Sequence, residues 1–152
     1  MTNEKVLEHQ VGYQLKRAQH TLRLEMDEAL RELGLTTPQY AALSVLGDEP
    51  GLSGAELARR CFVTAQTMNQ ILTKLESAEF VERRPHPEHG RILSARLTKK
   101  GAKRVTRAHG VVEVIEERML DGLGRKKRAR LRDALQSCTE ALENGATAKL
   151  KS

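Results

Sequence analysis

Two capped segments separated by a very short connection constrain the fold of this chain most. Ser53 precedes the first segment and Glu56 follows three residues later, a spacing that predicts a reciprocal helix N-terminal cap. Thr64 is a capping hydroxyl for the second segment, which we expect to be helical over residues 65–78. Residues 62–63, together with the capping Thr64, form the connection. Two helices of unequal length joined by about three residues are typical of a helix-turn-helix.

The second of these helices has two chemically different faces. An apolar stripe at i, i+3, i+4 and i+7 consists of Met68, Ile71, Leu72 and Leu75. The opposite face carries the amides and hydroxyl of Gln66, Asn69, Gln70 and Thr73 instead of the Glu and Lys that suit water. Amides and hydroxyls both donate and accept hydrogen bonds, as recognition of base edges in a major groove requires. On this helix alone, an ordinary polar surface stays open as an alternative.

Beyond Phe80 the apolar pattern changes from helical to alternating. Residues 81–83 and 92–98 can alternate as strands, and the Pro-His-Pro-Glu-His-Gly segment at 85–90 predicts a hairpin tip. The hairpin is basic, and a basic hairpin after a helix-turn-helix predicts a wing. The whole chain of 152 residues carries 26 Lys and Arg against 20 Asp and Glu, a net charge of +6. This charge favours a polyanionic partner, nucleic acid above all.

Long amphipathic helices flank this central part. We expect one over residues 11–33 that ends at Gly34, one from Lys99, and a last one that carries Leu131, Leu135, Cys138 and Leu142. A further helix is expected to open at Thr37-Pro38 and to end near Gly47. The predicted fold is therefore mainly α with a small β-hairpin wing, in the order ααααββαα. One protomer has little to cover the long apolar stripes, which favours a homodimer. We expect residues 1–34 and 102–152 to form the helical dimerisation region and residues 35–101 a winged helix-turn-helix domain, as one continuous structural unit.

Several classes of protein are excluded by the sequence. No apolar run approaches the roughly 18 residues that span a bilayer, and the N-terminus lacks the layout of a secretory signal. Two cysteines, Cys61 and Cys138, are too few for a disulfide framework, so we expect a cytoplasmic protein. The chain has none of the common nucleotide-binding or hydrolase motifs, and its five histidines do not have the spacing of a zinc site. We therefore expect no enzymatic activity, no cofactor and no metal.

Five segments between Leu52 and Gly101 carry a resemblance to a known family. They are LSGAELARR (52–60), VTAQTMNQIL (63–72), LESAEFVER (75–83), RRPHPEHGR (83–91) and LTKKG (97–101). With the flanking helices, they resemble the MarR family of bacterial transcriptional regulators over nearly the whole chain. The resemblance implies an obligate homodimer with interlocked terminal helices. It also implies a repressor of nearby operons that is released by a small, often phenolic or anionic, ligand or by oxidation.

The expected function is therefore sequence-specific binding of double-stranded DNA by a transcriptional regulator, a ligand- or stress-responsive repressor. Two copies of the second helix would require a pseudo-palindromic, inverted-repeat operator with half-sites about one helical turn apart. The expected DNA-binding residues are Ser53, Thr64, Ala65, Gln66, Thr67, Asn69, Gln70, Thr73, Lys74, Arg83, Arg84 and Arg91. We assign base contacts to Gln66, Thr67, Asn69 and Gln70. Phosphate contacts are assigned to Thr64, Lys74, Arg83 and Arg84. Ser53 is expected to cap its helix beside the DNA backbone, and the resemblance implies that Arg91 enters the minor groove.

One position departs from the family's wing. Counted back from Leu97-Thr98, Arg91 matches the usual wing arginine, but His89 stands where the family usually has an Asp. In relatives this Asp anchors the wing by an ion pair, which His89 cannot supply. Glu88 is a candidate substitute for the missing negative charge.

An effector site is the least defined expectation. The resemblance implies a cleft between the dimerisation helices and the winged domain. The candidate lining residues are Tyr13, His20, Met26, Tyr40 and His109, each of which also fits an ordinary core position. The expected ligand is a small phenolic or anionic effector.

Four alternatives stay open. A non-enzymatic helical dimeric adaptor that binds an acidic protein partner, or a non-specific architectural DNA-binding protein, fits the same charge and helices. Cys61, next to the turn, is either an oxidation sensor or a buried, inert thiol. The basic run at residues 125–132 is either a second phosphate-binding patch or a solvated start of the last helix.

Overall fold

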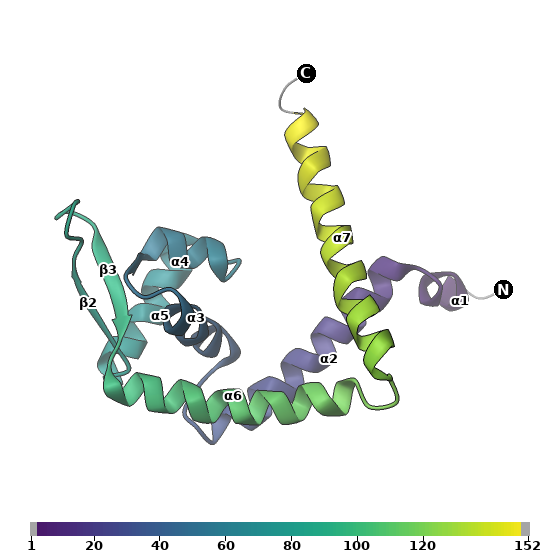
Figure 1. The fold of residues 1–152 in the computed structure, drawn as a ribbon, viewed down its shortest axis with the longest axis horizontal. Helices are drawn as coiled ribbons and strands as arrows, with labels where there is room; N and C mark the ends of the chain where they lie inside the picture. Colours follow the sequence, from purple (N-terminus) through teal and green to yellow (C-terminus); the bar gives the residue numbers. More distant parts are fainter. Residues whose placement is uncertain (1–2, 150–152) are drawn as a thin grey trace. The chain divides into compact units, whose positions relative to one another are not determined.

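The computed structural model describes residues 3–149 as long and short helices with a small antiparallel sheet (Figure 1). In chain order its elements are α1 (Asn3–Glu8), α2 (Val11–Arg31), α3 (Thr37–Asp48), β1 (Leu52–Ser53), α4 (Gly54–Arg60), α5 (Ala65–Ser77), β2 (Val81–Pro85), β3 (Leu93–Leu97), α6 (Lys99–Met119) and α7 (Arg125–Lys149). The expected fold class is confirmed, and α1 and β1 are elements that we did not expect. The chain forms two compact units, one that ends at Ile115 and one that begins at Glu116.

The ends of α2 and α3 are fixed by local hydrogen bonds. Gly34 ends α2 as expected, with a φ of +68° that favours glycine, and the Leu35 N–H donates to the Leu30 carbonyl at 3.1 Å. The expected cap of α3 at Thr37 is wrong by one residue. Thr36 is the N-cap because Gln39 stands three residues later: the Gln39 N–H donates to Thr36 Oγ1 at 3.3 Å and the Thr36 N–H to Gln39 Oε1 at 3.0 Å. The Thr37 hydroxyl instead donates to Asp27 of α2.

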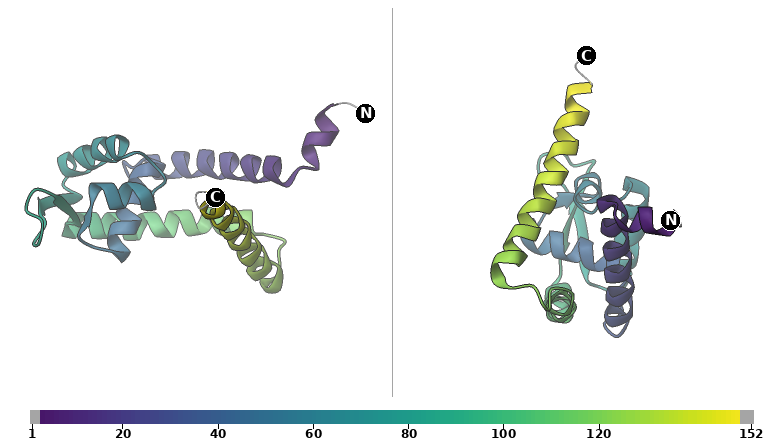
Figure 2. Two further views of the ribbon diagram at one scale, coloured as in Figure 1. Left: turned by 90° about the horizontal axis from the view of Figure 1, so that it is seen from above. Right: turned by 90° about the vertical axis from the view of Figure 1, so that its right-hand side faces the viewer.

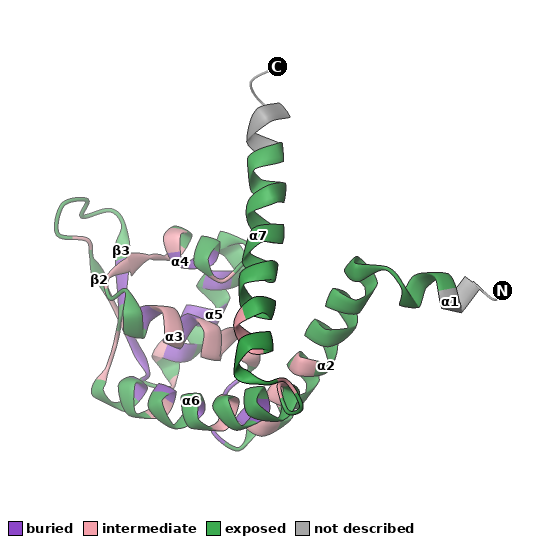
Figure 3. Ribbon diagram, turned by 45° about the vertical axis from the view of Figure 1, so that its right-hand side comes forward, coloured by how far each residue is buried: buried purple, intermediate pink, exposed green. Residues whose placement is uncertain are grey.

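The apolar faces of α3, α4 and α5 share one core (Figure 3). The expected stripe of α5 is confirmed: Met68 and Leu72 are 0% exposed, Leu75 1% and Ile71 9%. These side chains pack in the same cluster as Leu43, Leu46 and Leu57 of the two preceding helices. Burial of each such side chain contributes about 1.5–3 kcal/mol. The core therefore sets which face of α5 is left outside.

The sheet has the order β1-β3-β2, and both pairings are antiparallel. The expected hairpin is present, with Val81 opposite Leu97 and Pro85 opposite Leu93. The expected alternation along its second strand is wrong, because Ser94 and Ala95 are consecutive and both buried. β3 is the central strand and contacts both α3 and α4, so residues on its two faces are covered.

The root of the wing is joined tightly to α6. The Thr98 N–H donates to the Phe80 carbonyl at 3.0 Å, and the Gly101 N–H donates to Thr98 Oγ1 at 3.0 Å. A Cβ atom on Gly101 would lie 1.9 Å from the Phe80 carbonyl oxygen. Only glycine permits this approach of the first turn of α6 to the end of the helix-turn-helix. These contacts fix the direction in which the hairpin extends from the end of α5.

The terminal helices are covered less completely than the winged part. The second half of α2 packs on the core through Leu30, but in its first half Val11 is 70% and Leu15 42% exposed, and this half projects beyond α3–α5 (Figure 2). On α7 the expected stripe residues Leu131 and Leu135 are each 40% exposed. No helix within residues 3–149 is long and apolar enough to cross a membrane.

Candidate nucleic-acid interface

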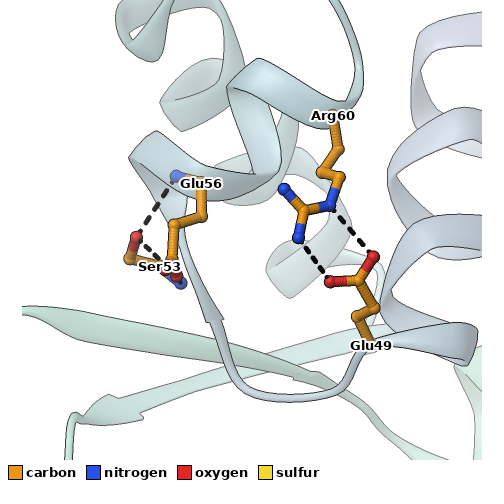
Figure 4. A network of polar contacts seen from close by, with 4 residues as sticks. All are labelled: Glu49, Ser53, Glu56 and Arg60. Carbon is orange, nitrogen blue, oxygen red and sulfur yellow. Dashed lines mark hydrogen bonds and ion pairs between the residues drawn. The ribbon is translucent and has the colours of Figure 1, made fainter.

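Two sets of polar contacts fix α4, the supporting helix (Figure 4). Ser53 caps it as expected: the Glu56 N–H donates to Ser53 Oγ at 3.2 Å, and the Ser53 N–H donates to Glu56 Oε2 at 2.9 Å. At the other end, Arg60 donates from Nε and Nη2 to the two carboxylate oxygens of Glu49 at 2.9 and 2.7 Å. This bidentate pair joins the last turn of α4 to the residue that follows α3.

Both carboxylates in these contacts are stabilised in the charged form. The hydrogen bonds from Arg60 hold the pKa of Glu49 below its ordinary value of 4.5. The backbone and hydroxyl hydrogen bonds from Ser53 lower the pKa of Glu56 in the same way. The Ser53 hydroxyl also donates to Glu56 Oε2 at 3.1 Å, so this expected DNA-binding residue is already engaged in its cap.

The turn before α5 exposes an aromatic side chain at a position expected only to connect two helices. Phe62 has a φ of +58° and its side chain is 95% exposed. The signal that could have marked it is an aromatic residue in a two-residue helix connection. Its neighbour Cys61 is half-buried, and burial raises the pKa of the Cys61 thiol, which disfavours the reactive thiolate. Of the two alternatives for Cys61, the structure therefore favours the inert thiol.

The outer face of α5 is free of core contacts. Along this face the expected DNA-binding residues Ala65, Gln66, Thr67, Asn69, Gln70, Thr73 and Lys74 are all exposed. At its start the Thr67 N–H donates to Thr64 Oγ1 at 3.1 Å, which confirms Thr64 as the N-cap. A helix with a buried apolar stripe and an exposed row of amides has the form needed to enter a major groove.

Arg83 does not extend into solvent, unlike its neighbour on β2. It donates from Nε to Glu76 Oε1 at 2.6 Å and from Nη1 to Asn69 Oδ1 at 2.8 Å. Its Nη2 also lies 3.4 Å from Thr73 Oγ1, and the side chain is only 18% exposed. By contrast, the side chain of Arg84 is 70% exposed and pairs at 3.2 Å with Glu82 on its own strand. The two arginines expected at phosphates therefore occupy different environments.

The wing tip is held mainly by its backbone. The His86 N–H donates to the Ile92 carbonyl at 2.7 Å, and the Ile92 N–H to the His89 carbonyl at 2.8 Å. The imidazoles of His86 and His89 stack with centroids 5.4 Å apart. Arg91 is exposed, and within residues 3–149 it forms no ion pair with Glu88, the proposed substitute for the missing Asp.

The candidate effector residues are brought together only in part. Tyr40 Oη of α3 lies 2.8 Å from His109 Nδ1 of α6, and the rings meet edge to face at 5.5 Å. Met26 is half-buried against the core, whereas Tyr13 and His20 are exposed on α2. In the described part of the chain no three His, Cys, Asp or Glu side chains form a cluster that could hold a metal ion.

The basic run at the start of α7 is partly engaged within its own unit. Arg128 pairs with Glu117 at 2.9 Å and donates from Nε to the Leu123 carbonyl at 3.0 Å. The other basic side chains of residues 125–132 are exposed. Both interpretations of this run stay open.

Comparisons with known proteins agree with this geometry. Residues 33–92 match the model of the MarR family. The "HTH-type transcriptional repressor Rv2887" of Mycobacterium tuberculosis is 46% identical over 110 residues, 72% of this chain and 79% of that protein. A crystal structure of Rv2887 in complex with DNA has a TM-score of 0.72 at 39% identity and covers 85% of this chain and 97% of that chain.

A second solved structure is similar over a longer part of the chain. The transcriptional repressor CouR, bound to a 23-mer DNA duplex, has a TM-score of 0.83 at 27% identity and covers 91% of this chain and 99% of that chain. The family match at residues 33–92 contains the helix-turn-helix, and the structural matches cover 85% and 91% of the chain. The chain belongs to the MarR family of helix-turn-helix transcriptional regulators.

Proposed function

We propose that this chain is a repressor that binds double-stranded DNA as a homodimer and inserts α5 into the major groove. The observation that carries the proposal is the division of α5 into a buried apolar stripe and an exposed row of amides and hydroxyls. The solved structures of Rv2887 with DNA and of CouR with a DNA duplex support it. The chain acts in the cytoplasm as a regulator without enzymatic activity.

Roles for individual residues follow from their exposure. Gln66, Thr67 and Gln70 contact bases, since their side chains lie on the outer face of α5. Lys74 and Arg84 contact phosphates, and Arg91 at the wing enters the minor groove. Residues 35–101 form the DNA-binding domain, and residues 1–34 with 102–152 form the dimerisation region.

The homodimer accounts for apolar side chains that the chain's own described residues leave uncovered. Leu15 and Leu24 of α2 are 42% and 56% exposed, and Leu142 of α7 is 78% exposed. A second copy offers the same surfaces, and a two-fold arrangement can bury both sets at once. Two copies of α5 then address the two halves of an inverted repeat.

A small aromatic acid is the proposed effector. Rv2887 has been solved in complex with salicylic acid and with p-aminosalicylic acid. The Tyr40–His109 pair provides a phenol and an imidazole between α3 and α6, and either group can hydrogen-bond a carboxylate. An effector bound next to α3 would alter the packing of the core that supports α5.

Selection from random DNA duplexes, followed by gel shifts, tests the function. Enrichment of an inverted repeat is the expected result. Uniform binding to all duplexes would instead indicate an architectural protein, and no binding would indicate an adaptor for an acidic protein. Gln70→Ala should weaken binding to the selected site by about 1–3 kcal/mol and relax one base position. Gln14→Ala is the control outside the DNA-binding domain: it removes only the hydrogen bond from Gln14 Nε2 to the Glu8 carbonyl and should leave base preferences unchanged.

A further inference from the structure

Four side chains connect the wing to the outer face of α5. Asn69, Thr73 and Glu76 lie at i, i+4 and i+7 on α5, so they share one face of the helix. Arg83 of β2 contacts all three, with its shortest contacts to Glu76 at 2.5–2.6 Å. This network lies at the edge of the row of expected base contacts.

The charge of Arg83 is already neutralised inside the protein. Glu76 accepts from its Nε and pairs with its Nη2, while Asn69 accepts from Nη1. These contacts hold the guanidinium against α5, and at 18% exposure little of the side chain faces solvent or a phosphate. Among the described residues, Arg84 pairs only with Glu82, at 3.2 Å, and 70% of its side chain is exposed, so most of its guanidinium can reach a phosphate.

The contact with Arg83 determines how the Asn69 carboxamide is turned. A guanidinium has only donors, so the amide atom that faces Arg83 must be the oxygen. The Thr73 hydroxyl donates to the Asn69 backbone carbonyl at 2.9 Å and therefore does not compete for Oδ1. Within the described part of the chain the Asn69 Nδ2 group donates to no protein acceptor, and Asn69 is exposed. Its two N–H donors are left for a ligand.

We propose that Arg83 is a positioning residue that holds the Asn69 carboxamide with Nδ2 outward, so that α5 recognises a base with a hydrogen-bond acceptor at that position. The role rests on the proposed function, because it requires α5 to enter the major groove. The acceptors available there are guanine N7 and O6, adenine N7 and thymine O4. Glu76 supports the same arrangement by fixing Arg83 from the other side.

Arg83→Met tests this role through base preference rather than affinity alone. In binding selections, the preference at one base position in each half-site should fall from about tenfold to about threefold or less, because the amide is free to turn over. The dependence of binding on salt should stay as in the wild-type protein, since no phosphate contact is lost. Arg84→Met is the matched comparison. It should keep every base preference, and it should lower the steepness of the plot of log binding constant against log salt concentration by about 0.9.

Asn69→Asp provides an independent test at the same position. A carboxylate keeps the contact with Arg83 but presents an acceptor outward in place of the donor. Cytosine offers only its N4 donor in the major groove, so its frequency at that position should rise, while adenine can still be bound through its N6 donor. No rise in cytosine in Asn69→Asp would overturn the proposal.

Folding is checked by thermal unfolding and circular dichroism of each variant. If Arg83→Met does not fold, Arg83→Lys replaces it, because a single ammonium can pair with Glu76 without also fixing Asn69; the same loss of preference is expected. Unchanged base preferences with a salt slope lowered by about 0.9 in the Arg83 variant would instead make Arg83 a phosphate contact. Absence of any enriched site for the wild-type protein would overturn the proposed function itself.

Discussion

The helices α5 and α7 carry apolar side chains at the same helical spacing, but their surroundings differ. On α5, Leu72 and Leu75 are 0% and 1% exposed within the helix-turn-helix core. On α7, Leu135 is 40% and Leu142 78% exposed. Figure 3 shows the described part of α7 coloured mostly as exposed. Periodicity therefore shows which face of a helix is apolar, but it does not show which atoms cover that face. For α5 the chain itself supplies them, and for α7 we propose a second copy.

Leu72→Ala should have the largest effect, because it opens a cavity in the core that holds α5. The expected loss is about 2–5 kcal/mol in the free energy of unfolding, measured by urea denaturation. Since the contacts lie within one chain, the loss should be similar at low and high protein concentration. A urea midpoint for the variant equal to that of the wild-type protein would show that the core does not depend on this side chain.

Leu135→Ala should act on self-association rather than on the core of the winged part. If the partner copy buries the exposed 40% of this side chain, its loss weakens the dimer by about 0.6–1.2 kcal/mol for each of its two protomers. Sedimentation equilibrium measures the dissociation constant. Gln136→Ala, one residue further along α7, is the control, and equal dissociation constants for the two variants would contradict the assignment of the stripe to the dimer interface.

Ser53→Ala should have a smaller effect, because it removes one cap from the start of α4. We expect a loss of about 1 kcal/mol in the free energy of unfolding, as measured by thermal denaturation. Ser53→Thr retains a hydroxyl and should restore most of the stability. A full loss in the threonine variant would show that the space around Ser53, rather than its hydrogen bonds, matters.

The smallest expected effect is a dependence of stability on acid pH. The pKa values of Glu49 and Glu56 are lowered in the folded protein, so both carboxylates contribute stability above their unfolded-state pKa. This contribution is lost as the pH falls from about 4.5 through the lower folded pKa values. The double variant Glu49→Gln, Glu56→Gln should therefore lose less stability than the wild-type protein between neutral pH and pH values below this range. Melting temperatures that fall equally with pH in the two proteins would contradict the prediction.

Local features of the fold were predictable because their causes lie within a few residues of the chain. The capping box at Ser53 and the end of α2 at Gly34 depend on side chains and φ angles nearby. The cap at Thr36 was missed by one position because two threonines stand together and only the first has Gln39 three residues later. β1 was missed because a two-residue strand has no periodicity and exists only by pairing with β3.

The candidate interface was predictable from the sequence only in part. The exposed side chains of α5 follow from the helical period once its apolar stripe is assigned to the core. The engagement of Arg83 does not, since Glu76 and Asn69 reach it from another element, 7 and 14 residues away in sequence. Likewise, no local pattern indicates that Tyr40 and His109, 69 residues apart, share a hydrogen bond.

By itself, the sequence determined the long helices, the caps of α4 and α5, the wing and the family, since these depend on short-range spacing and on residue types that solvation and backbone geometry restrict. The tertiary structure alone decided which polar side chains are satisfied within the protein and which remain available. Arg83 and Arg84 are adjacent and chemically identical, yet one is 18% and the other 70% exposed. The physical reason is that alternate residues of a strand face opposite sides, and only one of those sides meets α5.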